Sequence, residues 1–147
     1  MKRLFHLAKR AATSFSNDPL SGVDVERVER LLLLPEFELW WTMQPRDQRH
    51  SLHVHERFMR LYPPAKRTEQ AAALLHDVGK TVSNLGWFMR VIATIVGPRG
   101  LSFSLYHDHE NLGVQMLQGI SEQRTIDLLG GTVEDVVMDA LRDADNI

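Results

Sequence analysis

The sequence predicts an all-α fold, in which one compact domain is built from several packed helices. Apolar residues recur every three or four positions along nearly the whole chain, which is the period of helices with one buried face. No alternation of apolar and polar residues is long enough for a β-strand. Proline and glycine clusters divide the pattern into segments of ordinary helical length.

The predicted helices follow from these breaks in chain order. Pro35 lies in the first turn of its helix, where the missing N–H costs no hydrogen bond. Thr68 is the expected N-cap of the helix that contains AAALLHDVG, and Thr132 with Asp135 resembles a capping box. The helices are predicted at residues 23–34, 36–43, 46–62, 68–80, 84–96, 108–119, 121–129 and 132–145.

Length and composition fit a single domain. The 147 residues are 44% apolar and 24% charged, as in ordinary globular proteins. The net charge of −2 argues against general binding to nucleic acid, so no specific nucleic-acid binding is expected. The chain has no cysteine, which excludes disulfides, thiolate nucleophiles and zinc sites of the cysteine type. Any metal must therefore be held by histidines and carboxylates.

No membrane span is predicted. The most apolar stretch, residues 85–96, contains Arg90 and is too short to cross a bilayer. Residues 1–22 form a basic N-terminal segment without the apolar region of a secretory signal, and we expect a cytoplasmic location. The segment is predicted to be a terminal helix packed on the domain of residues 23–147; contact with an anionic membrane is the alternative.

Two polar residues stand inside the apolar run AAALLHDVG. His76 and Asp77 are expected on a buried helix, where an ionised carboxylate needs a partner. A divalent cation is one such partner. The alternative is a solvated pair at the end of a helix that stops before Gly79.

Two further residues are predicted to point inward. His50 shares a helix face with Val54, Phe58 and Leu61. Asp145 follows the apolar stripe of the last predicted helix, whereas Asp143 lies on another side of that helix. The stripe comprises Val133, Val136, Val137, Ala140, Leu141 and Ala144.

Together, two imidazoles and two carboxylates suit one cation such as Mn²⁺, Fe²⁺, Co²⁺, Mg²⁺ or Zn²⁺, with positions left for water and substrate. Such a cation lowers the pKa of water and polarises a phosphoryl oxygen.

Four motifs occur in the order RDQRHSLHV, ALLHDVGK, HDHENLG and LRDADNI. Their order resembles that of the HD-domain superfamily of metal-dependent phosphohydrolases, over roughly the last three quarters of the chain. The resemblance implies an HD-type helical domain with the metal site in its core, held by His50, His76, Asp77 and Asp145. It also implies catalytic roles for Asp77, which orients or deprotonates water, for Lys80 near the substrate phosphate, and for His109.

Several other residues are candidates for substrate binding. Arg46 and Arg49 flank His50 and can clamp an anion, although solvated charges are the alternative. Lys80 and His107 are further candidates. His53 shares a face with His50, whereas His55 is expected on the surface.

The predicted function is hydrolysis of a phosphomonoester or phosphodiester, with a nucleotide as one possible substrate. Only His107 and His109 lie between the HD pair and Asp145, too close together for the usual second-metal pattern, so one metal is expected. The alternatives are an HD-type di-iron oxygenase and a non-catalytic signalling or binding module that retains the metal. The sequence leaves the substrate and a homo-oligomer open.

Overall fold

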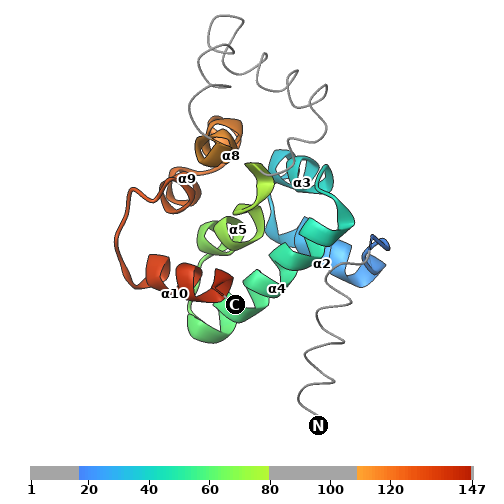
Figure 1. The fold of residues 1–147 in the computed structure, drawn as a ribbon, viewed down its shortest axis with the longest axis horizontal. Helices are drawn as coiled ribbons and strands as arrows, with labels where there is room; N and C mark the ends of the chain where they lie inside the picture. Colours follow the sequence, from blue (N-terminus) through green and yellow to red (C-terminus); the bar gives the residue numbers. More distant parts are fainter. Residues whose placement is uncertain (1–16, 80–108, 147) are drawn as a thin grey trace, which may run out of the picture.

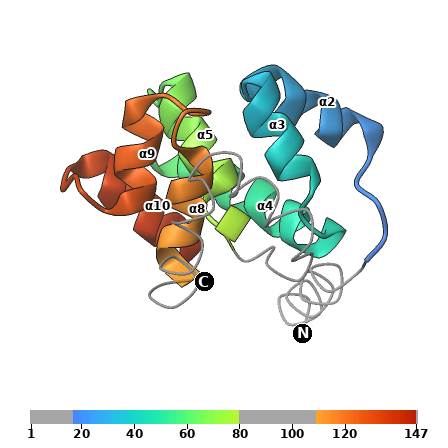
Figure 2. The same cartoon turned by 90° about the horizontal axis from the view of Figure 1, so that it is seen from above.

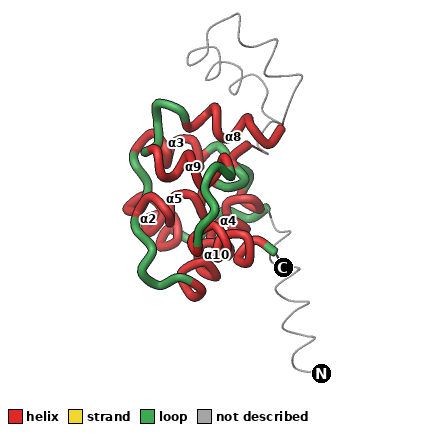
Figure 3. The backbone as a smooth tube through the Cα atoms, turned by 90° about the vertical axis from the view of Figure 1, so that its left-hand side faces the viewer, coloured by secondary structure: helices red, strands yellow, loops and turns green. Residues whose placement is uncertain are grey.

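The computed structural model describes residues 17–79 and 109–146, and in these ranges the chain is helical without a strand (Figures 1 and 3). This confirms the all-α prediction. The helices are α2 Gly22–Leu31, α3 Leu34–Trp41, α4 Pro45–Leu61, α5 Arg67–Leu75, α8 His109–Leu117, α9 Gln123–Gly130 and α10 Val136–Asp145. The basic segment of residues 1–16 and the predicted helix at residues 84–96 lie outside the described residues.

Local hydrogen bonds explain where several helices begin. Ser21 caps α2, because its Oγ accepts from the N–H of Asp24 at 3.2 Å. Pro35 stands in the first turn of α3, as predicted. Thr68 is not the cap of α5: that helix starts after Lys66, whose N–H donates to Glu69 at 2.9 Å.

The start of α10 also differs from the prediction. Asp135, rather than Thr132, is its N-cap, and Oδ1 of Asp135 accepts from the N–H groups of Val137 and Met138 at 3.0 Å each. Thr132 belongs to the preceding turn, where its hydroxyl donates to the carbonyl of Asp127 at 3.2 Å. The last helix is therefore shorter than predicted.

Helix α5 is the centre of the fold. It packs against α4 and α9 and also contacts α2 and α3. Figure 2 shows α8, α9 and α10 on one side and α2 and α3 on the other, with α4 and α5 between them. The five residues from Ala71 to Leu75 are completely buried. The run AAALLHDVG predicts such a buried helix, but α5 ends at Leu75 rather than at residue 80, so His76 and Asp77 lie in the turn after it and not on the helix.

Two apolar clusters meet at α5. Their buried members include Val28, Leu39, Trp40, Leu74, Leu75, Met116 and Leu117 in the first, and Val54, Phe58, Ala72, Ala73, Leu128, Val137 and Ala144 in the second. Two residues of the predicted stripes are largely exposed: Leu61 is 53% exposed at the end of α4, and Val136 is 63% exposed at the start of α10. Both lie in terminal turns, which pack less completely than the middle of a helix.

Polar contacts fix both ends of α10. At its start, Nη2 of Arg124 lies 2.9 Å from Asp135 and 3.1 Å from Glu69, which ties α10 to α9 and α5. At its end, Nε of Arg57 on α4 donates to the carbonyl of Ala144 at 2.6 Å. These contacts place the last turn of α10 beside α4. None of the described helices combines the length and the apolar character that crossing a membrane requires.

Candidate metal centre

Three parts of the chain bring the predicted ligands together. His50 projects from α4, and His76 and Asp77 follow each other directly after the last residue of α5. Asp145 is the last residue of α10. The ends of α5 and α10 thus meet the side of α4, and the contact from Arg57 to Ala144 supports this meeting point.

The ligand atoms face one another. One ligand atom each from His50, His76 and Asp77 lies within 4.8 Å of the other two. Nε2 of His50 is 3.7 Å from Oδ2 of Asp77 and 3.4 Å from Oδ1 of Asp145. Nε2 of His76 is 3.4 Å and 3.3 Å from the same two oxygens. The two imidazole rings meet edge to face, with centroids 5.4 Å apart.

These separations fit a shared cation better than direct hydrogen bonds. Atoms about 2.1 Å from one ion lie about 3.0 Å apart at an octahedral angle and about 3.4 Å apart at a tetrahedral one. All four nitrogen–oxygen distances, 3.3–3.7 Å, exceed the usual hydrogen-bond range of about 2.7–3.2 Å. The group of His50, His76 and Asp77 could therefore hold a metal ion. Asp145 is not a member of that group, but its Oδ1 lies 3.4 Å from Nε2 of His50 and 3.3 Å from Nε2 of His76.

The orientation of His76 independently tests whether the cluster suits a metal ion. Its Nδ1 lies 2.8 Å from the carbonyl of Ala73, so Nδ1 carries the hydrogen and donates it. In the neutral ring Nε2 then presents a lone pair toward the carboxylates, and this buried atom has no partner within hydrogen-bond geometry. A backbone carbonyl that fixes the tautomer of a histidine is the usual second contact of a metal-ligating imidazole.

The carboxylates of Asp77 and Asp145 need a positive charge close to them. Burial lowers the pKa of His76, but its interactions with Asp145 and Asp77 outweigh this effect and raise the pKa to about 9. In return, the interaction with His76 lowers the pKa of Asp145, against a smaller effect of burial. Without a cation, His76 is thus protonated at neutral pH, and its positive charge balances one of the two carboxylates. A bound metal would replace this proton.

A pocket of about 460 Å³ opens beside the cluster. His76, Asp77 and Asp145 line one part of it, and side chains of α4, α9 and α10 line the rest. Gly113 of α8 also borders the pocket, and a Cβ atom at this position would lie 3.3 Å from the backbone nitrogen of Gly79. This contact would be tight, so a side chain here would require a small shift between α8 and the turn after Asp77. The pocket thus leads directly to His76, Asp77 and Asp145.

Other predicted site residues are only partly placed. Lys80 and His107 lie outside the described residues. His109 is the first residue of α8, but its side chain also lies outside the described part of the structure.

The arginines that flank His50 do not line this pocket. Arg46 pairs with Asp47 at 3.4 Å. Arg49 donates to the carbonyl of Asp18 at 2.8 Å and borders a second, smaller cavity together with His53. Among the residues that line the larger pocket, the arginine is Arg142.

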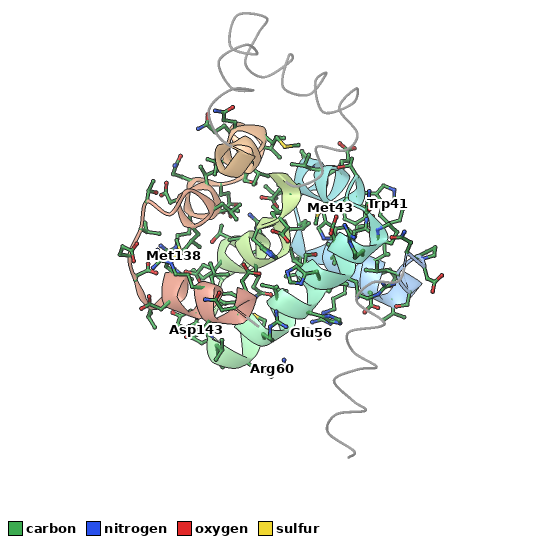
Figure 4. The ribbon with its side chains drawn as sticks, viewed as in Figure 1. Trp41, Met43, Glu56, Arg60, Met138 and Asp143 are labelled. Atoms are coloured by element: carbon green, nitrogen blue, oxygen red, sulfur yellow. The ribbon has the colours of Figure 1, made fainter. Side chains whose placement is uncertain are left out.

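The surface position predicted for His55 is wrong. His55 is only 3% exposed, and its Nε2 lies 3.1 Å from Oε1 of Gln70 on α5. Helix α4 packs on more than one side, so a residue away from the His50 face is also buried. Asp143, in contrast, is exposed on α10 as expected (Figure 4).

Sequence reasoning missed two arginines near the site. Arg57 holds the carbonyl that precedes Asp145. Arg142 lies three residues before Asp145 and borders the pocket, where it pairs with Glu134 at 2.8 Å. The spacing of Arg142 from Asp145, almost one helical turn, was a usable signal for its position. For Arg57 no local signal existed, because its partner is 87 residues away in the chain.

Neither protein-family models nor curated proteins nor solved structures give a match to this chain.

Proposed function

We propose that this protein is a metal-dependent phosphohydrolase that cleaves a phosphomonoester or phosphodiester. One divalent ion is held by His50, His76, Asp77 and Asp145. The observation that carries the proposal is the convergence of two imidazole nitrogens and two carboxylates at ligand-like separations, 3.3–3.7 Å, beside an open pocket. Their order in the chain, H…HD…D, resembles that of the HD-domain superfamily and supports hydrolysis over other uses of such a site.

The metal ion and the residues around it have separate roles in the proposed reaction. A bound divalent cation supplies Lewis acidity, which makes water more acidic and withdraws charge from a phosphoryl oxygen. Asp77 borders the pocket and takes the proton of the attacking water. The water oxygen bonds to phosphorus as the ester P–O bond breaks, and the proton that Asp77 has accepted passes to the leaving alkoxide oxygen, which departs as the alcohol. His76 stays oriented through its Nδ1–H bond to Ala73.

The sequence favours hydrolysis over a di-iron reaction, because only His107 and His109 lie between the HD pair and Asp145. In the described ranges, 17–79 and 109–146, the ligand group found comprises His50, His76 and Asp77, with Asp145 beside it. Four ligands suit one ion that keeps positions for water and substrate.

The direct test measures phosphate release by purified protein that has been stripped with a chelator and reloaded with Mn²⁺, Co²⁺, Fe²⁺, Mg²⁺ or Zn²⁺. The substrates are aryl phosphates, alkyl phosphates and nucleotides. We expect activity that requires metal and falls about 10²–10⁴-fold in Asp77→Asn, which keeps the shape of the side chain but cannot accept the proton.

The matched control is Asp143→Asn, because Asp143 is an exposed carboxylate on the same helix as Asp145. This variant should keep wild-type activity. Stoichiometric metal binding without hydrolysis of any ester would overturn the proposal in favour of a binding module. Two irons per chain with oxygen-dependent turnover would favour the oxygenase.

A further inference from the structure

The pocket beside the metal cluster is apolar over most of its wall. Its aliphatic side chains come from three helices, and Val54, Leu128 and Met138 are almost completely buried in the core (Figure 4 labels Met138). Leu129 and Leu141 are half-buried and complete this wall. A bound molecule that reaches the metal ligands from this side therefore lies against hydrocarbon.

The polar groups of the pocket are gathered at one end. His76, Asp77 and Asp145 stand together at the proposed metal site, and Arg142 is the other charged residue among the described residues that border the pocket. Arg142 already pairs with Glu134 through two contacts of 2.8 and 2.9 Å. Among the described lining residues there is no serine, threonine, asparagine, glutamine or tyrosine.

This distribution disfavours a nucleobase in the pocket. A base has several hydrogen-bonding groups on its edges, and each one that leaves water without a new partner costs free energy. Sites that recognise such groups place matching donors and acceptors opposite them. The aliphatic wall offers none, whereas an alkyl or aryl group loses nothing there and gains from leaving water.

We infer that the substrate is a phosphate ester of an apolar alcohol, whose hydrocarbon part occupies the pocket while the phosphate meets the metal cluster. This inference rests on the proposed function for the identity of the reacting group. The cavity of about 460 Å³ lies within the usual range for small-molecule sites, about 300–1,000 Å³. It accommodates a hydrocarbon group of several carbon atoms.

The first experiment is a binding series that requires no hydrolysis. Methyl-, butyl-, hexyl- and octylphosphonate are titrated calorimetrically into the Mn²⁺-loaded protein, and adenosine 5′-monophosphate is titrated into the same sample. We expect affinity to rise up to about fourfold for each added methylene until the pocket is filled. The nucleotide should bind no more tightly than methylphosphonate.

Two substitutions then test whether the gain in affinity with chain length comes from the pocket wall. Leu141→Gln places an amide on the wall, whereas Val136→Gln makes the same change at a 63% exposed position of the same helix that does not line the pocket. We expect Leu141→Gln to flatten the chain-length dependence and Val136→Gln to leave it unchanged. If Leu141→Gln fails to fold, the wild-type series alone decides, because it needs no variant.

Parallel hydrolysis assays with the corresponding alkyl phosphates separate this inference from the proposed function. Hydrolysis with no dependence on chain length, or tighter binding of the nucleotide, overturns the apolar substrate class and leaves the hydrolase intact. A rising phosphonate series without hydrolysis of any ester supports the pocket and overturns the hydrolase. A flat series without hydrolysis overturns both.

Discussion

Asp145 is the most exposed of the four proposed ligands. Its side chain is 51% exposed, against 9% for Asp77, yet Oδ1 lies 3.3 Å and 3.4 Å from the two imidazole nitrogens. The interaction with His76 favours the charged form of this carboxylate, and the proposed cation would be a second partner for it. Its contribution to metal binding can be measured separately from catalysis.

Replacing Asp145 by Ala is expected to weaken Mn²⁺ binding by at least about 100-fold, because loss of even an outer partner of a metal ligand costs about 10–100-fold. The measurement is calorimetric titration of the stripped protein. Asp143→Ala, two residues earlier and exposed, serves as the control and should bind as wild type does. Equal affinities in the two variants would remove Asp145 from the ligand set.

His55 gives the fold a pH dependence that is independent of the metal cluster. Burial lowers the pKa of this imidazole below its usual 6.5, against a smaller raising effect of Gln70. Above pH 6.5 the imidazole is neutral in both the folded and the unfolded chain, and stability is unaffected. As the pH falls below about 6.5, the unfolded chain takes up a proton that the folded chain resists, and the free energy of unfolding decreases.

We therefore expect His55→Gln to reduce the loss of stability between pH 6.5 and 5 relative to wild type. Urea unfolding of both proteins across pH 5–7.5 gives the comparison, and the difference between the two curves isolates His55 from His76. Curves that stay parallel over the whole interval would show that His55 does not resist protonation in the folded protein.

The individual residues show how far sequence reasoning reaches. The positions of His50, His76 and Asp77 in one cluster follow from helical period and from the cost of burying polar groups. His55 could not be placed in the same way, because a helical wheel assumes one buried face. Helix α4 is covered both by α5, which supplies Gln70, and by α10, so burial there depends on partners that are distant in the chain.

At the scale of helices, Arg57 holds the end of α10 in place. Its Nε donates at 2.6 Å to the carbonyl of Ala144, one of the last carbonyls of the helix, which lack partners within it. A cation at this position also interacts favourably with the negative end of the helix dipole. Because Asp145 is the next residue, Arg57 acts as a positioning residue for the proposed ligand.

Arg57→Ala is expected to weaken metal binding about 10-fold, in the range known for outer partners of metal ligands. Arg57→Lys keeps the charge and a donor, and should restore part of the affinity. Arg60→Ala, an exposed position on the same helix (Figure 4), is the control. If thermal stability falls in Arg57→Ala while metal affinity stays at the wild-type value, the arginine has a purely structural role.

Helix boundaries were predicted less well than the existence of the helices. The sequence offers both Thr132 and Asp135 as caps for α10, and local pattern alone favoured the earlier one. The structure uses Asp135, whose carboxylate also meets Arg124 at 2.9 Å. That contact joins α9 to α10 across a turn, so the choice of cap depends on tertiary structure that the local sequence does not encode.

For the whole molecule, the all-helical class and the central place of AAALLHDVG were predictable because a run of buried residues needs neighbours on every side. For His50 and Asp145, the sequence predicted only that both side chains point toward the interior, not that they meet. Their separation of 3.4 Å depends on how α10 packs on α4, which is fixed by Arg124, Asp135 and Arg57. The pocket wall could not be predicted, because it combines side chains from three helices.

A metal ion that joins α4, the end of α5 and α10 should stabilise the whole fold, because a ligand that binds only the folded state adds about 2.7 kcal/mol at 100 times its Kd. For a chain of this size we expect Tm to rise by about 5–10 °C on addition of Mn²⁺ and to return to its original value with a chelator. His50→Ala should lose most of this shift. His53→Ala, almost one turn further along α4 and beside the other cavity, should keep it. Equal shifts in both variants would place the stabilising ion elsewhere, and no shift in the wild type would show that the four side chains meet without binding metal.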